Sequence, residues 1–120
     1  MMRIFANSLA VVLASGLVGC HSKVLDVTLT NSSQQPVTTI SVDYPGATFG
    51  KDRLDPGQIF HYVIKPVDTG QLKIQFADAE GHTHNVTGPA VKKGDEGSVQ
   101  ISFDQSTATA RIQLSGLKAD

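Results

Sequence analysis

Two histidines stand in a spacing that suits metal binding. His82 and His84 are two residues apart in a stretch that alternates like a strand, so both side chains would point to one face and could ligate one ion. Asp78, Glu80 and, from another predicted strand, His61 are conceivable further ligands. The plainer interpretation is that one histidine lies over the sheet while the other is exposed. Metal binding through His82 and His84 is therefore an alternative function.

Other catalytic and cofactor chemistries lack the residues that they need. The chain has a single cysteine, Cys20, and its two methionines are Met1 and Met2. A blue-copper site needs a cysteine thiolate and usually a methionine, and haem attachment needs a Cys-x-x-Cys-His motif. Serine, histidine and aspartate occur without a nucleophile motif such as Gly-x-Ser-x-Gly. We expect no catalytic residue and no cofactor, and keep a hydrolase only as a third alternative.

Charge and length exclude a further class of partner. The chain has 120 residues, 10 of them basic and 11 acidic, and the longest basic cluster is Lys92-Lys93. A nucleic-acid binder would show a basic patch, which is missing here. The length fits one domain. We therefore expect no nucleic-acid partner.

The stretch 45–57 is the predicted surface segment that could recognise a protein. It contains Phe49, Lys51 and Arg53, and an aromatic side chain beside two cations can anchor a protein partner. The alternative is an edge strand in which Phe49 points inward while Lys51 and Arg53 protect the edge against aggregation.

The N-terminal segment differs in composition from everything that follows it. Arg3 is its only charge, and residues 4–19 are rich in leucine, valine and alanine. This run is short for a permanent membrane span but suits the apolar region of a signal peptide. It ends at Leu17-Val18-Gly19-Cys20, which resembles the lipobox of bacterial lipoprotein precursors.

The lipobox resemblance implies that Cys20 is the lipid attachment site. The sulfur of Cys20 would carry diacylglyceryl, cleavage would occur before Cys20, and the new N-terminus could also be acylated. Two or three acyl chains would anchor the chain stably, since each buried methylene contributes about 0.8 kcal/mol. In the Gram-negative proteins that it resembles, an aspartate after the cysteine favours inner-membrane retention. His21 stands there, which favours the outer membrane, facing the periplasm.

After Cys20 the hydrophobic periodicity is that of strands. Proline and glycine stand at the second and third positions of 44–47 and 55–58, which predicts type II turns, and 78–81 reads as a hairpin loop. The segment around Thr48 and Phe49 is an edge strand or a loop, and 59–64 is apolar on both faces, as in a central strand. Alternating residues predict seven strands, at 25–30, 39–44, 59–64, 72–77, 82–87, 99–104 and 108–114.

Seven short strands separated by turns predict an all-β fold: a seven-stranded antiparallel β-sandwich after an N-terminal signal helix. A small closed β-barrel is the alternative. The size and strand count are immunoglobulin-like, although the Cys-Trp-Cys signature is missing. Residues 31–44 and 54–66 resemble bacterial immunoglobulin-like or transthyretin-like modules, through an Asn/Ser turn before one strand and an Asp-Pro-Gly turn before another. That resemblance carries no active site.

Together these features predict a non-enzymatic envelope lipoprotein that binds an envelope protein or has a structural or assembly role. The expected organisation is a signal peptide over 1–19, a lipidated Cys20 with a tether over 20–23, a sandwich over 24–115 and a tail over 116–120. The tether residues His21, Ser22 and Lys23 would reach about 10 Å when extended. The domain is therefore expected to sit close against its membrane.

Overall fold

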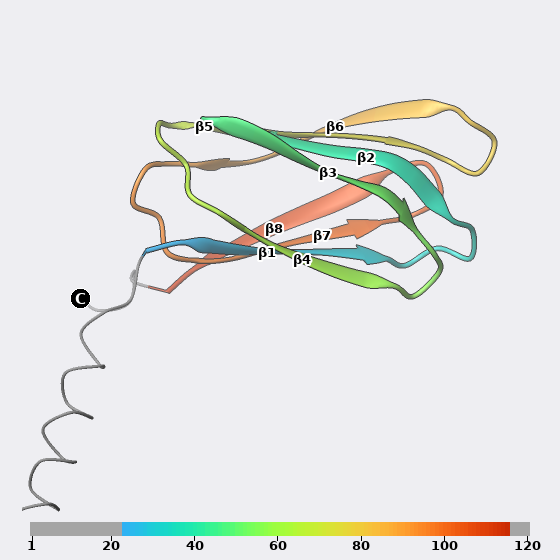
Figure 1. Ribbon diagram of the computed structural model, residues 1–120, viewed down its shortest axis with the longest axis horizontal. Coiled ribbons are helices and arrows are strands. Elements are labelled where there is room, and N and C mark those ends of the chain that lie inside the picture. Colours follow the sequence, from blue (N-terminus) through green and yellow to red (C-terminus); the bar gives the residue numbers. More distant parts are fainter. Residues whose placement is uncertain (1–22, 116–120) are drawn as a thin grey trace, which may run out of the picture.

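The computed structural model describes residues 23–115, which form two sheets packed face to face (Figure 1). The expected signal helix, Cys20 and the tail 116–120 lie outside the described residues. Within residues 23–115 no helix could cross a membrane. The eight strands are β1 (Leu25–Asn31), β2 (Val37–Tyr44), β3 (Ala47–Leu54), β4 (Ile59–Ile64), β5 (Gly70–Ala77), β6 (Thr83–Val91), β7 (Gly97–Phe103) and β8 (Ala108–Leu114).

The strands divide into one sheet in the order β4-β1-β7-β8 and another in the order β3-β2-β5-β6. The all-β, two-layer prediction is confirmed. Three finer predictions are wrong. The described residues form eight strands rather than seven, because the segment around Phe49 is a full strand, β3. The sheets are not purely antiparallel, because β1 and β7 pair in parallel. The closed barrel is wrong because the strands form two separate sheets.

The core lies between the sheets and follows from the two-residue period of the strands. In β1 the buried residues Leu25, Val27 and Leu29 alternate with Asp26, Thr28 and Thr30, because successive side chains point to opposite faces. The largest fully buried side chains are Phe76 of β5 and Phe103 of β7, whose rings meet edge to face with centroids 5.1 Å apart. The two sheets are therefore joined through their central strands.

Both sides of the sandwich are closed, but by different contacts. On one side Phe49 of β3 stacks on Tyr62 of β4 with centroids 4.4 Å apart, and the Lys51 amino group lies 4.9 Å from the centroid of the Phe60 ring. On the other side β6 and β8 approach each other. The prediction that 59–64 is a central strand is wrong: β4 is an edge strand, and its outward residues Ile59 and Val63 are each 54% exposed.

The predicted turns form where glycine permits a positive φ. Gly46 and Gly57 have φ values of 115° and 79°, and Gly81 in the β5-β6 hairpin has 87°. The hairpin strand runs on to Val91, so β6 is longer than the predicted 82–87. These turns determine which strand ends lie together at the same end of the sandwich.

Candidate functional site

One end of the sandwich gathers four connections. The chain enters at Lys23 and Val24, and strands then run back and forth along the long axis (Figure 1). The opposite end carries the β1-β2 connection, the β3-β4 turn, the β5-β6 hairpin and the β7-β8 turn, over residues 32–36, 55–58, 78–82 and 104–107. We call it the distal end because it lies away from the chain entry. Loops held by rigid strands are where recognition usually resides.

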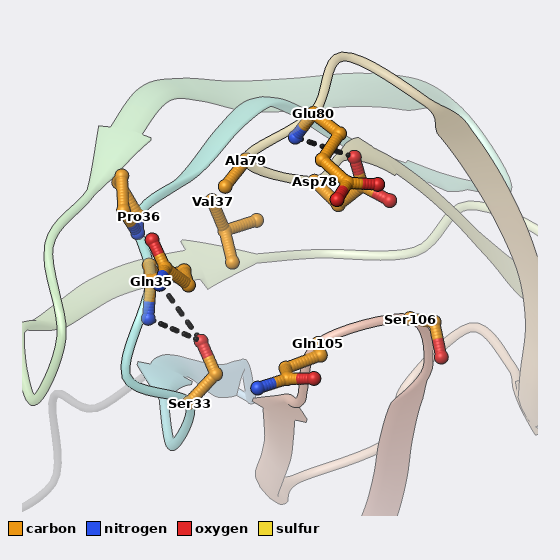
Figure 2. A pocket seen from close by; sticks show the side chains of 9 residues that line it. All are labelled: Ser33, Gln35, Pro36, Val37, Asp78, Ala79, Glu80, Gln105 and Ser106. Atoms are coloured by element: carbon orange, nitrogen blue, oxygen red, sulfur yellow. Dashed lines mark hydrogen bonds between the residues drawn. The ribbon is translucent and has the colours of Figure 1, made fainter.

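The distal end is hollowed into a pocket of about 530 Å³. Figure 2 shows Ser33, Gln35 and Pro36 from the β1-β2 connection, with Val37 at the start of β2, on one wall and Asp78 with Glu80 from the β5-β6 hairpin on another. The β7-β8 turn supplies the remaining wall. The lining residues are Ser33, Gln35, Pro36, Val37, Asp78, Ala79, Glu80, Gln105 and Ser106. Residues from three separate connections thus meet at one opening.

Asn31 holds this end together. It is fully buried at the end of β1. Its amide nitrogen donates to the carbonyls of Gln35 at 2.8 Å and Leu54 at 2.9 Å, and its amide oxygen accepts from the backbone N–H and the hydroxyl of Ser33. One side chain therefore ties the β1-β2 connection to the end of β3. Sequence reasoning missed this role, although Asn followed by two serines is a signal for such local bonds.

Asp78 organises the hairpin. Its Oδ1 accepts from the backbone amides of Glu80 and His82, both at 2.9 Å, and its Oδ2 lies 2.8 Å from His84 Nε2. The hydrogen bond to His84, followed by that from the His82 amide, lowers the pKa of Asp78 from 3.8 to about 2. The His84 ring also stacks on Phe76 with centroids 5.2 Å apart. Asp78 is thus held as a carboxylate at the pocket wall.

The histidine pair takes the plainer of its two expected arrangements. The His82 side chain is 71% exposed and the His84 side chain 25% exposed. Both approach the same oxygen of Asp78, with His82 Nδ1 at 3.7 Å. Within residues 23–115 no group of three or more histidine, cysteine, aspartate or glutamate side chains is arranged to hold a metal ion. His84 bonds to the hairpin carboxylate of Asp78.

His61 lies in the other sheet, away from this cluster. It belongs to β4, and its Nδ1 is 3.1 Å from the Thr28 hydroxyl on β1. The described residues therefore place one hydroxyl-histidine pair and one carboxylate-histidine pair in separate sheets. A hydrolytic triad needs all three groups in one chain of hydrogen bonds, and these two pairs do not form one.

The three residues of the predicted recognition segment lie on the edge strand β3. Phe49 is only 5% exposed and packs inward against Tyr62, so it cannot contact a partner while the sandwich stays closed. Lys51 lies over the Phe60 ring, and Arg53 pairs with Asp55 at 2.7 Å on the exposed surface. The edge-strand arrangement is the one observed. Lys51 and Arg53 remain reachable by a partner.

Comparison with known proteins finds a structure with a similar fold. No protein family matches the chain, and no curated protein matches its sequence. A solved structure, the NMR structure of a protein from Eubacterium rectale, is similar over 82% of this chain and 99% of that one, with a TM-score of 0.56 and 13% identity. At this identity the likeness concerns the fold alone.

Replacing Asp78 with asparagine is expected to remove part of the acid sensitivity of folding. The folded pKa of Asp78 lies below its ordinary value, so its carboxylate stabilises the fold above pH 4 and loses that effect as the pH falls from about 4 to about 2. The urea midpoints of wild type and Asp78→Asn should therefore differ most near pH 6 and converge near pH 2. A difference that does not change with pH would contradict this role.

Proposed function

We propose that this chain is a bacterial envelope lipoprotein, anchored through acyl chains on Cys20 in the outer membrane, whose domain faces the periplasm and binds an envelope protein without catalysing a reaction. The position of Cys20 at the end of the apolar run is the observation that carries the proposal. An apolar run over 4–19 ends directly before the only cysteine of the chain. The first strand, β1, begins at Leu25, five residues after it.

The start of the domain supports a short tether. The carbonyl of Val24 accepts from the backbone N–H of Gly97 at 3.2 Å, and β1 begins at Leu25. Only His21, Ser22 and Lys23 then separate Cys20 from residues fixed in the fold. Such a tether reaches about 10 Å. The chain-entry end would therefore face the bilayer, and the distal end with its pocket would face outward.

Two features support binding rather than catalysis. The hydrogen-bonded pairs Thr28-His61 and Asp78-His84 lie in different sheets and form no triad. The accessible polar and cationic groups instead lie where a protein could reach them, at the distal pocket and at Lys51 and Arg53 of β3. A partner-binding or assembly role uses such surfaces and needs no reacting group.

Within the sandwich class, we propose the transthyretin-like alternative. In a constant-type immunoglobulin domain the first two strands share a sheet. Here β1 and β2 lie in different sheets. This strand order favours the transthyretin-like half of the sequence resemblance.

Replacing Cys20 with serine tests the anchor. The Cys20→Ser precursor is expected to take up no labelled fatty acid and to stay uncleaved, because the thiol is the site of lipid transfer and cleavage follows lipidation in the proteins that it resembles. Labelling with a fatty acid and gel mobility of the precursor measure both effects. Ser22→Ala, two residues away, serves as the matched control and should be labelled and cleaved normally. Normal maturation of Cys20→Ser would contradict the assignment.

A further inference from the structure

Strand β4 has a free edge. It pairs with β1, and among residues 23–115 no strand covers its other side. The Gln58 carbonyl accepts from the Asn31 amide, which sets the alternation of an antiparallel pair. The Gln58 carbonyl and the backbone groups of residues 60, 62 and 64 point to β1, so the N–H and C=O groups of Ile59, His61 and Val63 point away from it. This edge can accept another strand.

The other three edge strands carry features that discourage pairing. β3 carries Lys51, Asp52 and Arg53 in succession, β6 contains Pro89, and β8 carries the exposed Arg111 at its centre. Charges and proline on an edge are the usual means of preventing unwanted strand addition. β4 contains neither a charged residue nor a proline. It is the unprotected edge of the described fold.

The side chains of β4 also suit a partner strand. Ile59 and Val63 are each 54% exposed on the outer face, on either side of His61. On the inner side the Lys51 amino group lies over Phe60, and Lys65 follows the strand directly. An added strand would therefore meet apolar side chains on one face and a cation on the other.

We propose that an extended segment of an envelope protein, apolar at alternate positions and carrying a carboxylate that pairs with Lys51, adds to β4 as a fifth strand. Backbone hydrogen bonds to Ile59, His61 and Val63 provide affinity, and the side-chain alternation provides specificity. This inference rests on the proposed protein-binding function and names the surface and the kind of partner that it uses.

A second copy of the chain could pair with the β4 edge, but the resulting dimer conflicts with the membrane orientation proposed above. Antiparallel pairing about His61 would set Ile59 opposite Val63 of the other copy. It would also place Val24 of the two copies at opposite ends of the joined sheet, since the strands run in opposite directions. The chain-entry ends of the two copies could not then both face one membrane, as the proposed orientation requires. A partner segment from another protein meets no such conflict.

The test is site-specific photo-crosslinking of the full lipidated chain in its own membrane. A benzophenone amino acid replaces Ile59 or Val63, and the adducts are mapped by mass spectrometry. Adducts from both positions are expected on one segment of one partner, about four residues apart, because the segments pair in register. A reporter at Arg111, on the β8 edge, should give no adduct with that segment.

Proline at position 61 separates strand addition from other contacts. The N–H of His61 points to the free edge, so His61→Pro removes a donor to the partner but none to β1, and adduct yield should fall about tenfold. His61→Thr keeps the N–H and should retain the adducts. Should His61→Pro prove unfolded by its urea midpoint, Lys51→Glu leaves the β4 backbone unchanged and should also lower the yield, by repelling the partner carboxylate on the inner side.

The outcomes distinguish the inference from the function on which it rests. Adducts with a second copy, adducts out of register, or adducts unchanged in a folded His61→Pro chain would overturn strand addition. A reporter at Glu80 probes the distal pocket in the same membranes. Protein adducts from Glu80 but none from Ile59 or Val63 would overturn strand addition and leave protein binding standing. No protein adduct from any position would count against both.

Discussion

Replacing Gly97 with alanine is expected to lower the free energy of unfolding by about 4 kcal/mol, since a strained φ and a forced overlap each cost roughly 1–3 kcal/mol. Gly97 begins β7 with a φ of 153°, and a Cβ there would lie 2.1 Å from the Gln113 carbonyl oxygen and 2.9 Å from the Leu114 Cα. Both atoms belong to the backbone of β8, which cannot move without breaking its pairing with β7.

Gly94→Ala provides the matched control. Gly94 also has a positive φ, 87°, but a Cβ there would meet nothing within 4 Å. Its substitution should cost only the conformational part, about 1 kcal/mol. Urea unfolding of both variants with unchanged slopes gives the difference, which measures the overlap with β8. Equal midpoints for the two variants would contradict the tight packing of Gly97.

Replacing Asn31 with alanine is expected to cost about 3 kcal/mol, since each buried polar group left without a partner costs about 1–3 kcal/mol. Alanine would remove the donor to the Leu54 carbonyl and the acceptor for the Ser33 amide, both of which are buried bonds. The Gln35 carbonyl would keep its bond from the Ser33 hydroxyl. Asn31→Ala should therefore leave two buried groups, the Leu54 carbonyl and the Ser33 amide, without a hydrogen-bond partner.

Hydrogen exchange locates the effect of Asn31→Ala. The Ser33 amide should exchange faster in the variant. Exchange of the amides in the centre of β7 should change only as much as the global free energy of unfolding changes. Ser32→Ala changes an exposed neighbour and should stay within about 0.5 kcal/mol of wild type. A loss in Asn31→Ala no larger than that of Ser32→Ala would show that Asn31 does not hold the distal end.

Local pattern predicted the core because burial in a two-layer fold follows the two-residue period. The alternation of Leu25, Val27 and Leu29 required no knowledge of the partner strands. The same reasoning failed for 59–64, whose apolar residues on both faces suggested a central strand. A strand's place within its sheet depends on distant segments, and β4 lies at an edge with Ile59 and Val63 exposed.

In the candidate site, too, contacts between residues near in the sequence were easier to predict than contacts between distant ones. Asp78 was named only as a conceivable further metal ligand beside His82 and His84, and the structure places its Oδ2 2.8 Å from His84 Nε2. His61 was grouped with them on residue type alone, but the topology puts it in the other sheet. The role of Asn31 depends on bonds to Leu54, which is distant in sequence. The positions of His61 and Asn31 depend on contacts between segments that are distant in the sequence. Local sequence patterns do not show such contacts.

The parallel pairing of β1 with β7 is a further example. Leu25 lies beside Gly97 and Asn31 beside Phe103. The first strand therefore pairs with a strand that is about 70 residues away in the sequence. Parallel neighbours need a long connection between them. No turn signal marks such a pair. The sequence shows both strands but not their direction relative to each other.

The most direct test of the account is the mass of the N-terminal peptide of the mature protein purified from its native envelope. The account predicts a peptide that begins at Cys20 and carries a diacylglyceryl group, with or without a further acyl chain on its amino group. Recovery in the outer-membrane fraction would agree with His21 at the position after the cysteine. A mature chain that begins at another residue, or that begins at Cys20 without lipid, would contradict the central claim.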